Sequence, residues 1–234
     1  MTALVLTARL SSAISVHVVD GSDMPTPEAW SSLSAAETKR ALRLRKVTMR
    51  KRFVVVRHAL RCLLGERLGL LAREVDLGTT NNGRPVLLSG AEKGVHFSVT
   101  HAATASFVAI ASGPVGIDAE TVRPHDWNRP AAELVLSPAE LAWLDAQPDP
   151  DTSFCRAWTR KEAFAKFDGR GLSRDLRGIT LTPTPRCGSI SSVVSIIDLH
   201  GGYDTVLAVA TAHGPLPAAA ESAARPRRAE WQSR

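Results

Sequence analysis

The sequence predicts an α+β fold built from helices and antiparallel sheets. Segments with strand and helix character alternate in two comparable passes, the first ending at about residue 106 and the second at about residue 213. The chain has 234 residues, of which 44% are hydrophobic and 22% are charged, so it can bury a core as one large domain or two small ones. The last segment, residues 214–234, is rich in Ala, Pro and Arg, which predicts a mobile tail.

The first pass is expected to contain an N-terminal strand, a helix and a second strand. The N-terminal segment lacks a basic start and includes Arg9, which favours an alternating strand over a signal peptide. Apolar residues then recur at helical spacing, which predicts a helix from about Thr48 to Leu68 that ends near Gly69. The apolar stripe of this helix consists of Phe53, Val56, Leu60, Leu63 and Leu64. The segment FSVTHA, residues 97–102, forms the second strand.

Positive charge is concentrated on and before this helix. Between Lys39 and Arg67 the sequence contains eleven Lys and Arg residues and a single acid, Glu66, whereas the whole chain has a net charge of +6. When the apolar stripe is buried, the arginines of the helix are expected to be exposed. They form either a solvated basic face or a surface that binds an anionic partner.

The second pass begins with two strands, FVAIA at residues 107–111 and VGIDAE at residues 115–120, which a Gly-Pro break separates. Helices are expected near residues 137–146 and 153–167. Further strands are expected within residues 177–182, 190–198 and 205–211.

The VGIDAE strand ends with two carboxylates. In an extended chain Asp118 and Glu120 point to the same side, about 6 to 7 Å apart, and they repel each other unless a cation lies between them. One interpretation is a metal site with oxygen ligands. The other is a strand that runs out into a solvated acidic turn.

The later helix of the second pass carries another charged pattern. Trp158, Glu162 and Lys166 lie one helical turn apart, so a carboxylate and an ammonium share one face, and Gly169 and Gly171 end the helix. Taken alone, the charged pair is also typical of an i,i+4 ion pair on a surface helix. Together with the two strand carboxylates, Glu162 would complete a set of three oxygen donors suited to Mg2+.

Four sequence blocks together resemble the signature of the 4'-phosphopantetheinyl transferase superfamily. They are NNGRP at 81–85, FSVTHA at 97–102, VGIDAE at 115–120 and WTRKEAFAKFDGRGL at 158–172, in the order and at about the spacing found in the family. The length of the chain resembles the monomeric, two-lobed surfactin-synthetase-activating type.

This resemblance implies two similar, pseudo-symmetric α/β lobes. Residues 1–105 would contact the phosphates of coenzyme A, and residues 106–213 would hold the metal site and the catalytic helix. The implied activity is transfer of 4'-phosphopantetheine from coenzyme A to a serine of an acidic apo acyl or peptidyl carrier protein, with release of 3',5'-ADP. The implied ion is Mg2+, with Mn2+ as an alternative, and the carriers would serve fatty acid, polyketide or nonribosomal peptide biosynthesis.

The resemblance also implies roles for individual residues. The metal ligands fall on Asp118, Glu120 and Glu162, and Lys166 is the lysine that contacts the phosphate during catalysis. Glu162, directly or through a metal-bound water, is the preferred base, and Glu140 is the alternative. The residues expected to contact coenzyme A are Arg40, Arg52, Arg84, Thr100, His101, Lys161 and Lys166.

A basic nucleic-acid-binding protein without catalysis is the rival hypothesis, because a pI near 9.7 and a basic helix are typical of that class. An aromatic content of 5%, a single tyrosine and the lack of a zinc-finger or RNP-like motif disfavour it. No apolar run approaches the length of a membrane span. Three widely spaced cysteines, Cys62, Cys155 and Cys187, favour reduced thiols and a cytoplasmic protein.

Overall fold

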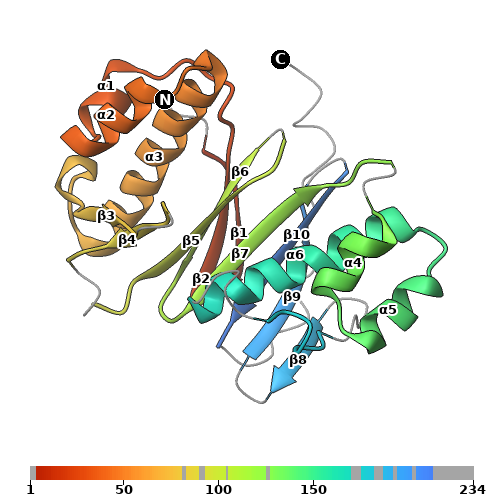
Figure 1. Cartoon of the computed structure of the whole chain (residues 1–234). Coiled ribbons are helices and arrows are strands. Elements are labelled where there is room, and N and C mark those ends of the chain that lie inside the picture. Colours follow the sequence, from red (N-terminus) through yellow and green to blue (C-terminus); the bar gives the residue numbers. More distant parts are fainter. Residues whose placement is uncertain are drawn as a thin grey trace.

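The computed structural model describes residues 4–80, 83–89, 93–103, 105–124, 127–169, 175–181, 187–191, 194–201 and 204–212. Within these residues, two four-stranded antiparallel sheets lie next to each other, with one group of helices beside each sheet (Figure 1). The predicted α+β class with antiparallel sheets is confirmed. Gly171 and the predicted tail at 214–234 lie outside the described residues.

The first sheet has the strand order β1-β2-β6-β5. Its strands are β1 (Leu4–Ser11), β2 (Ile14–Val19), β5 (His96–His101) and β6 (Ser106–Ala111). The N-terminal segment therefore forms a hairpin of two strands, where a single strand was expected. Strand β5 lies at one edge of the sheet and ends at His101.

The helices of the N-terminal half are α1 (Pro27–Ser31), α2 (Ala35–Arg43), α3 (Val47–Leu68) and the short 3-10 helix η1 (Ala72–Glu74), followed by a small hairpin of β3 (Leu77–Thr79) and β4 (Pro85–Leu87). Helix α3 packs against this sheet, and the shorter helices of that half pack against α3. Helix α3 agrees with the prediction and ends at Gly69, whose φ of 72° lies in the left-handed region that favours glycine. Val55 and Leu60 of α3 pack against Val108 and Ile110 of β6.

The second sheet has the order β7-β10-β9-β8. Its strands are β7 (Val115–Thr121), β8 (Cys187–Ser191), β9 (Val194–His200) and β10 (Thr205–Thr211), and its helices are α4 (Arg129–Val135), α5 (Pro138–Asp145) and α6 (Pro150–Asp168). The side chain of Asp149 caps α6 by accepting a hydrogen bond from the amide of Thr152, and Gly169 ends the helix with a φ of 78°. No helix in the described part of the chain has both the length and the apolarity needed to cross a membrane.

Two strand predictions in the C-terminal half need correction. Residues 177–181 form no strand; the amide of Ile179 donates to the carbonyl of Leu176 in a turn. Lys161 of α6 binds the carbonyl of Ile179, and Glu140 of α5 accepts from the amide of Leu181. The single strand expected within 190–198 is divided between the end of β8 and most of β9. In both places the apolar pattern is present, but the hydrogen-bond partners of the backbone decide the structure.

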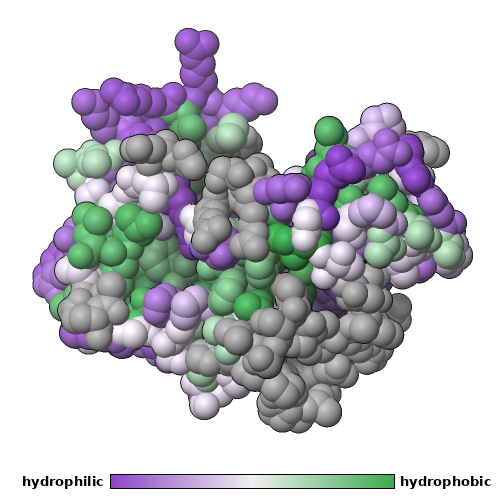
Figure 2. Space-filling model, turned by 60° about the horizontal axis from the view of Figure 1, so that its bottom comes forward, coloured by the Kyte–Doolittle hydropathy of each residue, from purple (hydrophilic) through white to green (hydrophobic). Residues whose placement is uncertain are grey.

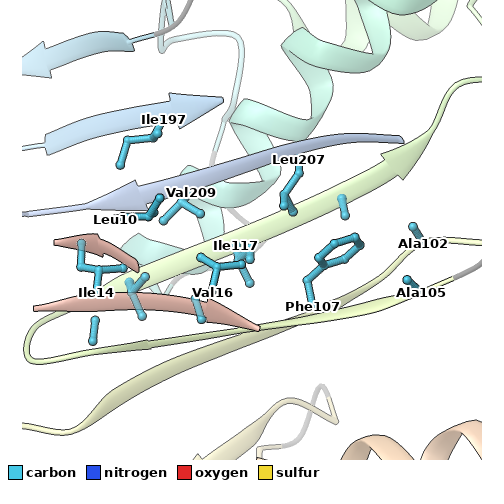
Figure 3. Close-up of a cluster of buried hydrophobic side chains, with 14 residues drawn as sticks. Leu10, Ile14, Val16, Ala102, Ala105, Phe107, Ile117, Ile197, Leu207 and Val209 are labelled. Atoms are coloured by element: carbon cyan, nitrogen blue, oxygen red, sulfur yellow. The ribbon is translucent and has the colours of Figure 1, made fainter. Parts of the chain in front are cut away.

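A shared apolar core joins the two sheets (Figure 3). Ile14, Val16 and Phe107 of the first sheet pack toward Ile117 and Val209 of the second. The edge strands β5 and β7 lie side by side, and the amide of Ile117 in β7 donates to the hydroxyl of Ser98 in β5 at 3.2 Å. The face in Figure 2 mixes apolar and hydrophilic residues, and the hydrophilic ones gather at its top. Because β5 and β7 are neighbours, the end of β5 lies next to the carboxylates of β7.

Candidate active site

Strands β5 and β7 and helix α6 meet at the carboxylate of Asp118. This residue is 5% exposed, and its Oδ1 accepts hydrogen bonds from Nζ of Lys166 at 2.6 Å and from the hydroxyl of Thr100 at 2.9 Å. Glu162 lies one turn before Lys166 on the same face of α6. Four residues singled out from the sequence are therefore neighbours in the structure.

Gly116 permits the close approach of β7 and α6. A Cβ atom at position 116 would lie 2.0 Å from the carbonyl oxygen of Ala163 and 2.4 Å from the amide nitrogen of Phe167. These separations are too short for any side chain, so only glycine allows the helix to lie at this distance from the strand. The position of Glu162 and Lys166 relative to Asp118 depends on this contact.

The carboxylates of this cluster destabilise one another's charged form. Desolvation raises the pKa of Glu162, and the negative charge of Asp118 raises it further. Desolvation and Asp118 also raise the pKa of Glu120, which accepts a hydrogen bond from Trp158. Oδ2 of Asp118 and Oε1 of Glu162 are buried and have no hydrogen-bond donor within the described protein.

The chemistry of these donors fits a hard divalent cation. An ion among three carboxylates would offset their mutual repulsion and would provide a partner for the two buried oxygen atoms. Among the residues that the structure describes, no group of three or more His, Cys, Asp or Glu side chains is arranged to hold a metal ion. Asp118 is instead paired with Lys166, so binding of an ion requires these side chains to rearrange.

A basic cluster surrounds the turn between β5 and β6. The hydroxyl of Ser106 lies 2.8 Å from Nδ1 of His101 and accepts a hydrogen bond from Nε of Arg52 at 3.2 Å. Arg52 also donates to the carbonyl oxygens of Ala102 and Ala105. Desolvation lowers the pKa of His101 to about 4, and neighbouring cations, Arg52 first among them, contribute to this shift. The imidazole is therefore neutral near pH 7 until an anion compensates the surrounding positive charge.

The aromatic ring of Phe53 orients two more cations of this cluster. The guanidinium carbons of Arg40 and Arg57 lie 5.4 Å and 5.3 Å from the centre of the ring. Arg40 also donates to the carbonyl of Gly83 at 3.3 Å. Arg57 is 7% exposed, contributes to the lowered pKa of His101, and has an Nη1 atom without a hydrogen-bond partner in the described protein. Sequence reasoning missed both Phe53 and Arg57 as site residues.

The expectation that the arginines of α3 are exposed is wrong for Arg57 and Arg61. Arg61 is 2% exposed and donates to Oε2 of Glu37, with distances of 2.9 Å from Nε and 2.7 Å from Nη2. Arg57 lies 3.5 Å from the other oxygen of Glu37. One buried carboxylate thus offsets two buried guanidinium groups, and positive charge remains in excess. The spacing of four residues from Phe53 to Arg57 to Arg61 was the available signal, because it places them on one helix face.

Comparison with known proteins tests the family resemblance of the sequence. The family model of the 4'-phosphopantetheinyl transferase superfamily matches residues 114–205. The 4'-phosphopantetheinyl transferase HetI of Nostoc sp. (strain PCC 7120) is 33% identical over 187 residues, which cover 77% of this chain and 79% of that protein. The chain belongs to the 4'-phosphopantetheinyl transferase superfamily. The 4'-phosphopantetheinyl transferase Sfp of Bacillus subtilis (strain 168) is 29% identical over 137 residues, covering 54% of this chain and 59% of Sfp.

Two residues that the family resemblance suggested serve the interior of the protein. Lys161 is fully buried, and its Nζ lies 2.7 Å from Oε2 of Glu140 and 2.6 Å from each of the carbonyl oxygens of Leu176 and Ile179. Glu140 also accepts hydrogen bonds from the amides of Ser137 and Leu181. The structure does not place Lys161 with the other residues expected to contact coenzyme A, because all three protons of its ammonium are bound elsewhere.

The structure places the remaining family positions, Thr100 and Arg84, in different surroundings. Thr100 is buried and donates to Asp118, so it orients a carboxylate and presents no exposed hydroxyl. Arg84 is half-buried, and desolvation lowers its pKa. Its neighbour Gly83 contacts Arg40, which puts the Gly-Arg-Pro segment beside the basic cluster. The two asparagines of the NNGRP block lie outside the described residues.

Proposed function

We propose that this protein is a 4'-phosphopantetheinyl transferase that moves the phosphopantetheine group of coenzyme A to a serine of an apo carrier protein. One observation carries the proposal: Glu162 and Lys166 of α6 face Asp118 of β7 across the tight contact at Gly116, in a member of this superfamily. HetI, of which the match covers 79%, is named as a 4'-phosphopantetheinyl transferase.

The carboxylate cluster is suited to a metal ion that supports this transfer. Asp118, Glu120 and Glu162 would hold Mg2+, or Mn2+ in its place, and the bound ion would neutralise charge on the pyrophosphate of coenzyme A. Lys166 has a 26% exposed side chain, so its ammonium can exchange its contact with Asp118 for an oxygen of the pyrophosphate. There it would stabilise the negative charge that develops on the leaving group.

The transfer forms a bond between the serine oxygen of the carrier and the β-phosphorus of coenzyme A. The bond from that phosphorus to the bridging oxygen breaks, and 3',5'-ADP leaves with this oxygen. The serine proton requires a base, and the raised pKa of Glu162 favours this carboxylate. Both oxygens of the alternative, Glu140, already accept hydrogen bonds in a fully buried position. Glu162 is therefore the base that we propose.

The basic cluster supplies a site for the 3'-phosphate of coenzyme A. Arg40, Arg52 and His101, together with Arg84 near the edge of the cluster, are the proposed contacts, and the buried Arg57 contributes its unpaired Nη1 and its charge. A phosphate would raise the pKa of His101 and compensate the excess positive charge.

The excess of cations also indicates the protein partner. We propose acidic apo acyl or peptidyl carrier proteins as acceptors, a monomeric enzyme and a cytoplasmic location. The net charge of +6 and the basic residues between Lys39 and Arg67 other than the buried Arg57 and Arg61 favour attraction to such carriers.

The deciding experiment incubates the protein with Mg2+, coenzyme A and several purified apo carriers, followed by intact-mass spectrometry of the carriers. A gain of one phosphopantetheine unit is expected on at least one of them. The variant Glu162→Gln serves as the control and should give little or no product. If no carrier gains mass, and the protein instead binds DNA or RNA tightly in a salt-sensitive way, the nucleic-acid alternative is correct.

A further inference from the structure

Thr100 of β5 directs its hydroxyl at the carboxylate cluster and away from the basic cluster. Successive side chains of a strand point to opposite faces, so Thr100 and its neighbour His101 meet different surroundings. His101 belongs to the basic cluster, whereas the hydroxyl of Thr100 donates to Oδ1 of Asp118 at 2.9 Å. Ser98, two residues earlier on the same face as Thr100, also reaches β7, where it accepts from the amide of Ile117. The single hydroxyl proton of Thr100 is therefore bound by a carboxylate.

The two carboxylate oxygens of Asp118 differ in what they contact. Oδ1 accepts hydrogen bonds from Thr100 and from Nζ of Lys166, at 2.9 Å and 2.6 Å. Oδ2 is buried and has no donor within the described protein, and Oε1 of Glu162 is in the same state. Burying carboxylate oxygens without a partner is costly, so these two atoms indicate where a cation would bind.

Thr100 and Lys166 hold Oδ1 in different ways. The side chain of Lys166 is 26% exposed and carries its ammonium on a flexible stem, so it can turn to the pyrophosphate of coenzyme A. Thr100 is 5% exposed, and its branched Cβ restricts rotation of the hydroxyl. When Lys166 leaves Asp118, Thr100 still holds Oδ1 and keeps the orientation of the carboxylate.

We infer that Thr100 is a positioning residue of the metal site, whose hydroxyl occupies Oδ1 of Asp118 and thereby leaves Oδ2 as the atom that binds the divalent cation. This inference rests on the proposed function. A donor that fixes a metal-binding side chain typically raises the affinity for the ion, because the ligand atom is already oriented. Thr100 then acts on the metal site and makes no contact with coenzyme A, contrary to the expectation from the sequence.

The test measures binding of Mn2+ by electron paramagnetic resonance without coenzyme A or carrier, so the readout does not depend on turnover. Thr100→Val keeps the shape of the side chain and removes the hydroxyl, and it should raise the Kd for Mn2+ about 10- to 100-fold. Thr100→Ser keeps the donor and should restore most of the affinity. In EDTA, Thr100→Val should keep the Kd for coenzyme A within about twofold of wild type.

The matched control is Thr159→Val on α6. Thr159 is 1% exposed, and its hydroxyl donates to the carbonyl of Cys155 at 2.7 Å, so this variant loses a buried threonine hydroxyl that touches no carboxylate. It should keep the Kd for Mn2+. Melting temperatures in EDTA show which variants fold, and Thr100→Ala, which removes the same hydroxyl without adding a methyl group, takes the place of Thr100→Val if valine is not tolerated.

The outcomes separate this inference from the proposed function. A Kd for Mn2+ that stays within about twofold of wild type in Thr100→Val overturns the inference. An equal loss of affinity in Thr159→Val or in Thr100→Ser also overturns it, because packing and not the donor would then set the affinity. Weaker binding of coenzyme A to Thr100→Val in EDTA would assign the hydroxyl to the nucleotide site instead.

Two results concern the wild-type protein. If it binds no Mn2+, the inference and the proposed metal site fail together. If it binds Mn2+ but modifies no carrier, the proposed function fails, and the effect of Thr100→Val on Mn2+ binding still decides the role of Thr100.

Discussion

Replacing Gly116 by alanine should disable transfer through geometry alone. The new Cβ atom would lie 2.0 Å from the carbonyl oxygen of Ala163, whereas ordinary van der Waals contact begins at 3.4 Å. Helix α6 must therefore move away from β7 by about 1.4 Å at this point, the difference between those two distances. The same movement would break the 2.6 Å contact between Lys166 and Asp118 and displace Glu162. A misplacement on the order of 1 Å costs about 100-fold in rate, so we expect kcat to fall by about that factor.

The measurement is kcat for carrier modification by mass spectrometry, accompanied by urea denaturation to record a destabilisation of about 1 to 3 kcal/mol. The control is Gly178→Ala, because its Cβ would have its nearest neighbour at 3.6 Å. That variant should keep both kcat and stability. If Gly116→Ala retains kcat within about threefold of wild type, the packing of α6 on β7 does not set the catalytic geometry.

The proposed metal site predicts that Asp118→Asn, Glu120→Gln and Glu162→Gln each lower kcat by about 100-fold or more, and that EDTA does the same. Normal turnover of the two glutamate variants at saturating Mg2+ would contradict it. Arg40→Ala, Arg57→Ala and His101→Ala should each weaken the binding of coenzyme A about 10- to 150-fold and the binding of 3'-dephospho-coenzyme A much less. Lys166→Ala should instead slow transfer from both cofactors to the same extent. The ratio of kcat/KM for the two cofactors decides this, and an unchanged ratio would place the 3'-phosphate elsewhere. Lys161→Met should lower the free energy of unfolding by about 3 to 5 kcal/mol, since it leaves Glu140 buried and unpaired, and adding Glu140→Gln should recover part of the loss. Equal stability of the single and double variants in urea would show that the pair is not coupled. Raising salt to about 0.5 M should increase KM for the carrier several-fold at constant kcat, and a flat response would mean that docking is mainly apolar.

Local spacing was sufficient to predict which side chains share the face that we propose to be catalytic. The two-residue period of a strand places Asp118 and Glu120 on one side, and the helical period places Glu162 and Lys166 on one face. The C-terminal ends of α3 and α6 were predicted for a similar reason, because each is followed by a glycine whose effect acts within one turn; α6 begins three residues earlier than expected. The signature blocks that contain these residues led to the correct superfamily.

Long-range contacts explain the predictions that the structure corrects. The apolar residues at 177–181 read as a strand, but their backbone is bound by the side chains of Lys161 and Glu140 from other helices. Arg57 and Arg61 were expected to be exposed, but Glu37, which lies 20 and 24 residues earlier, makes their burial tolerable. Neither partner could be identified from the residues near the segment concerned.

The sequence by itself determined which side chains share a face and which chemistry they bring, since these follow from the backbone period and from residue type. Only the tertiary structure decided which of those charges are paired in the interior and which stay partly exposed beside the carboxylate cluster. Lys161 and Lys166 lie five residues apart on the same helix, yet the first is enclosed by Glu140 and two carbonyls and the second reaches Asp118. Partner choice of this kind depends on the packing of distant segments, which the spacing of residues along one segment does not contain.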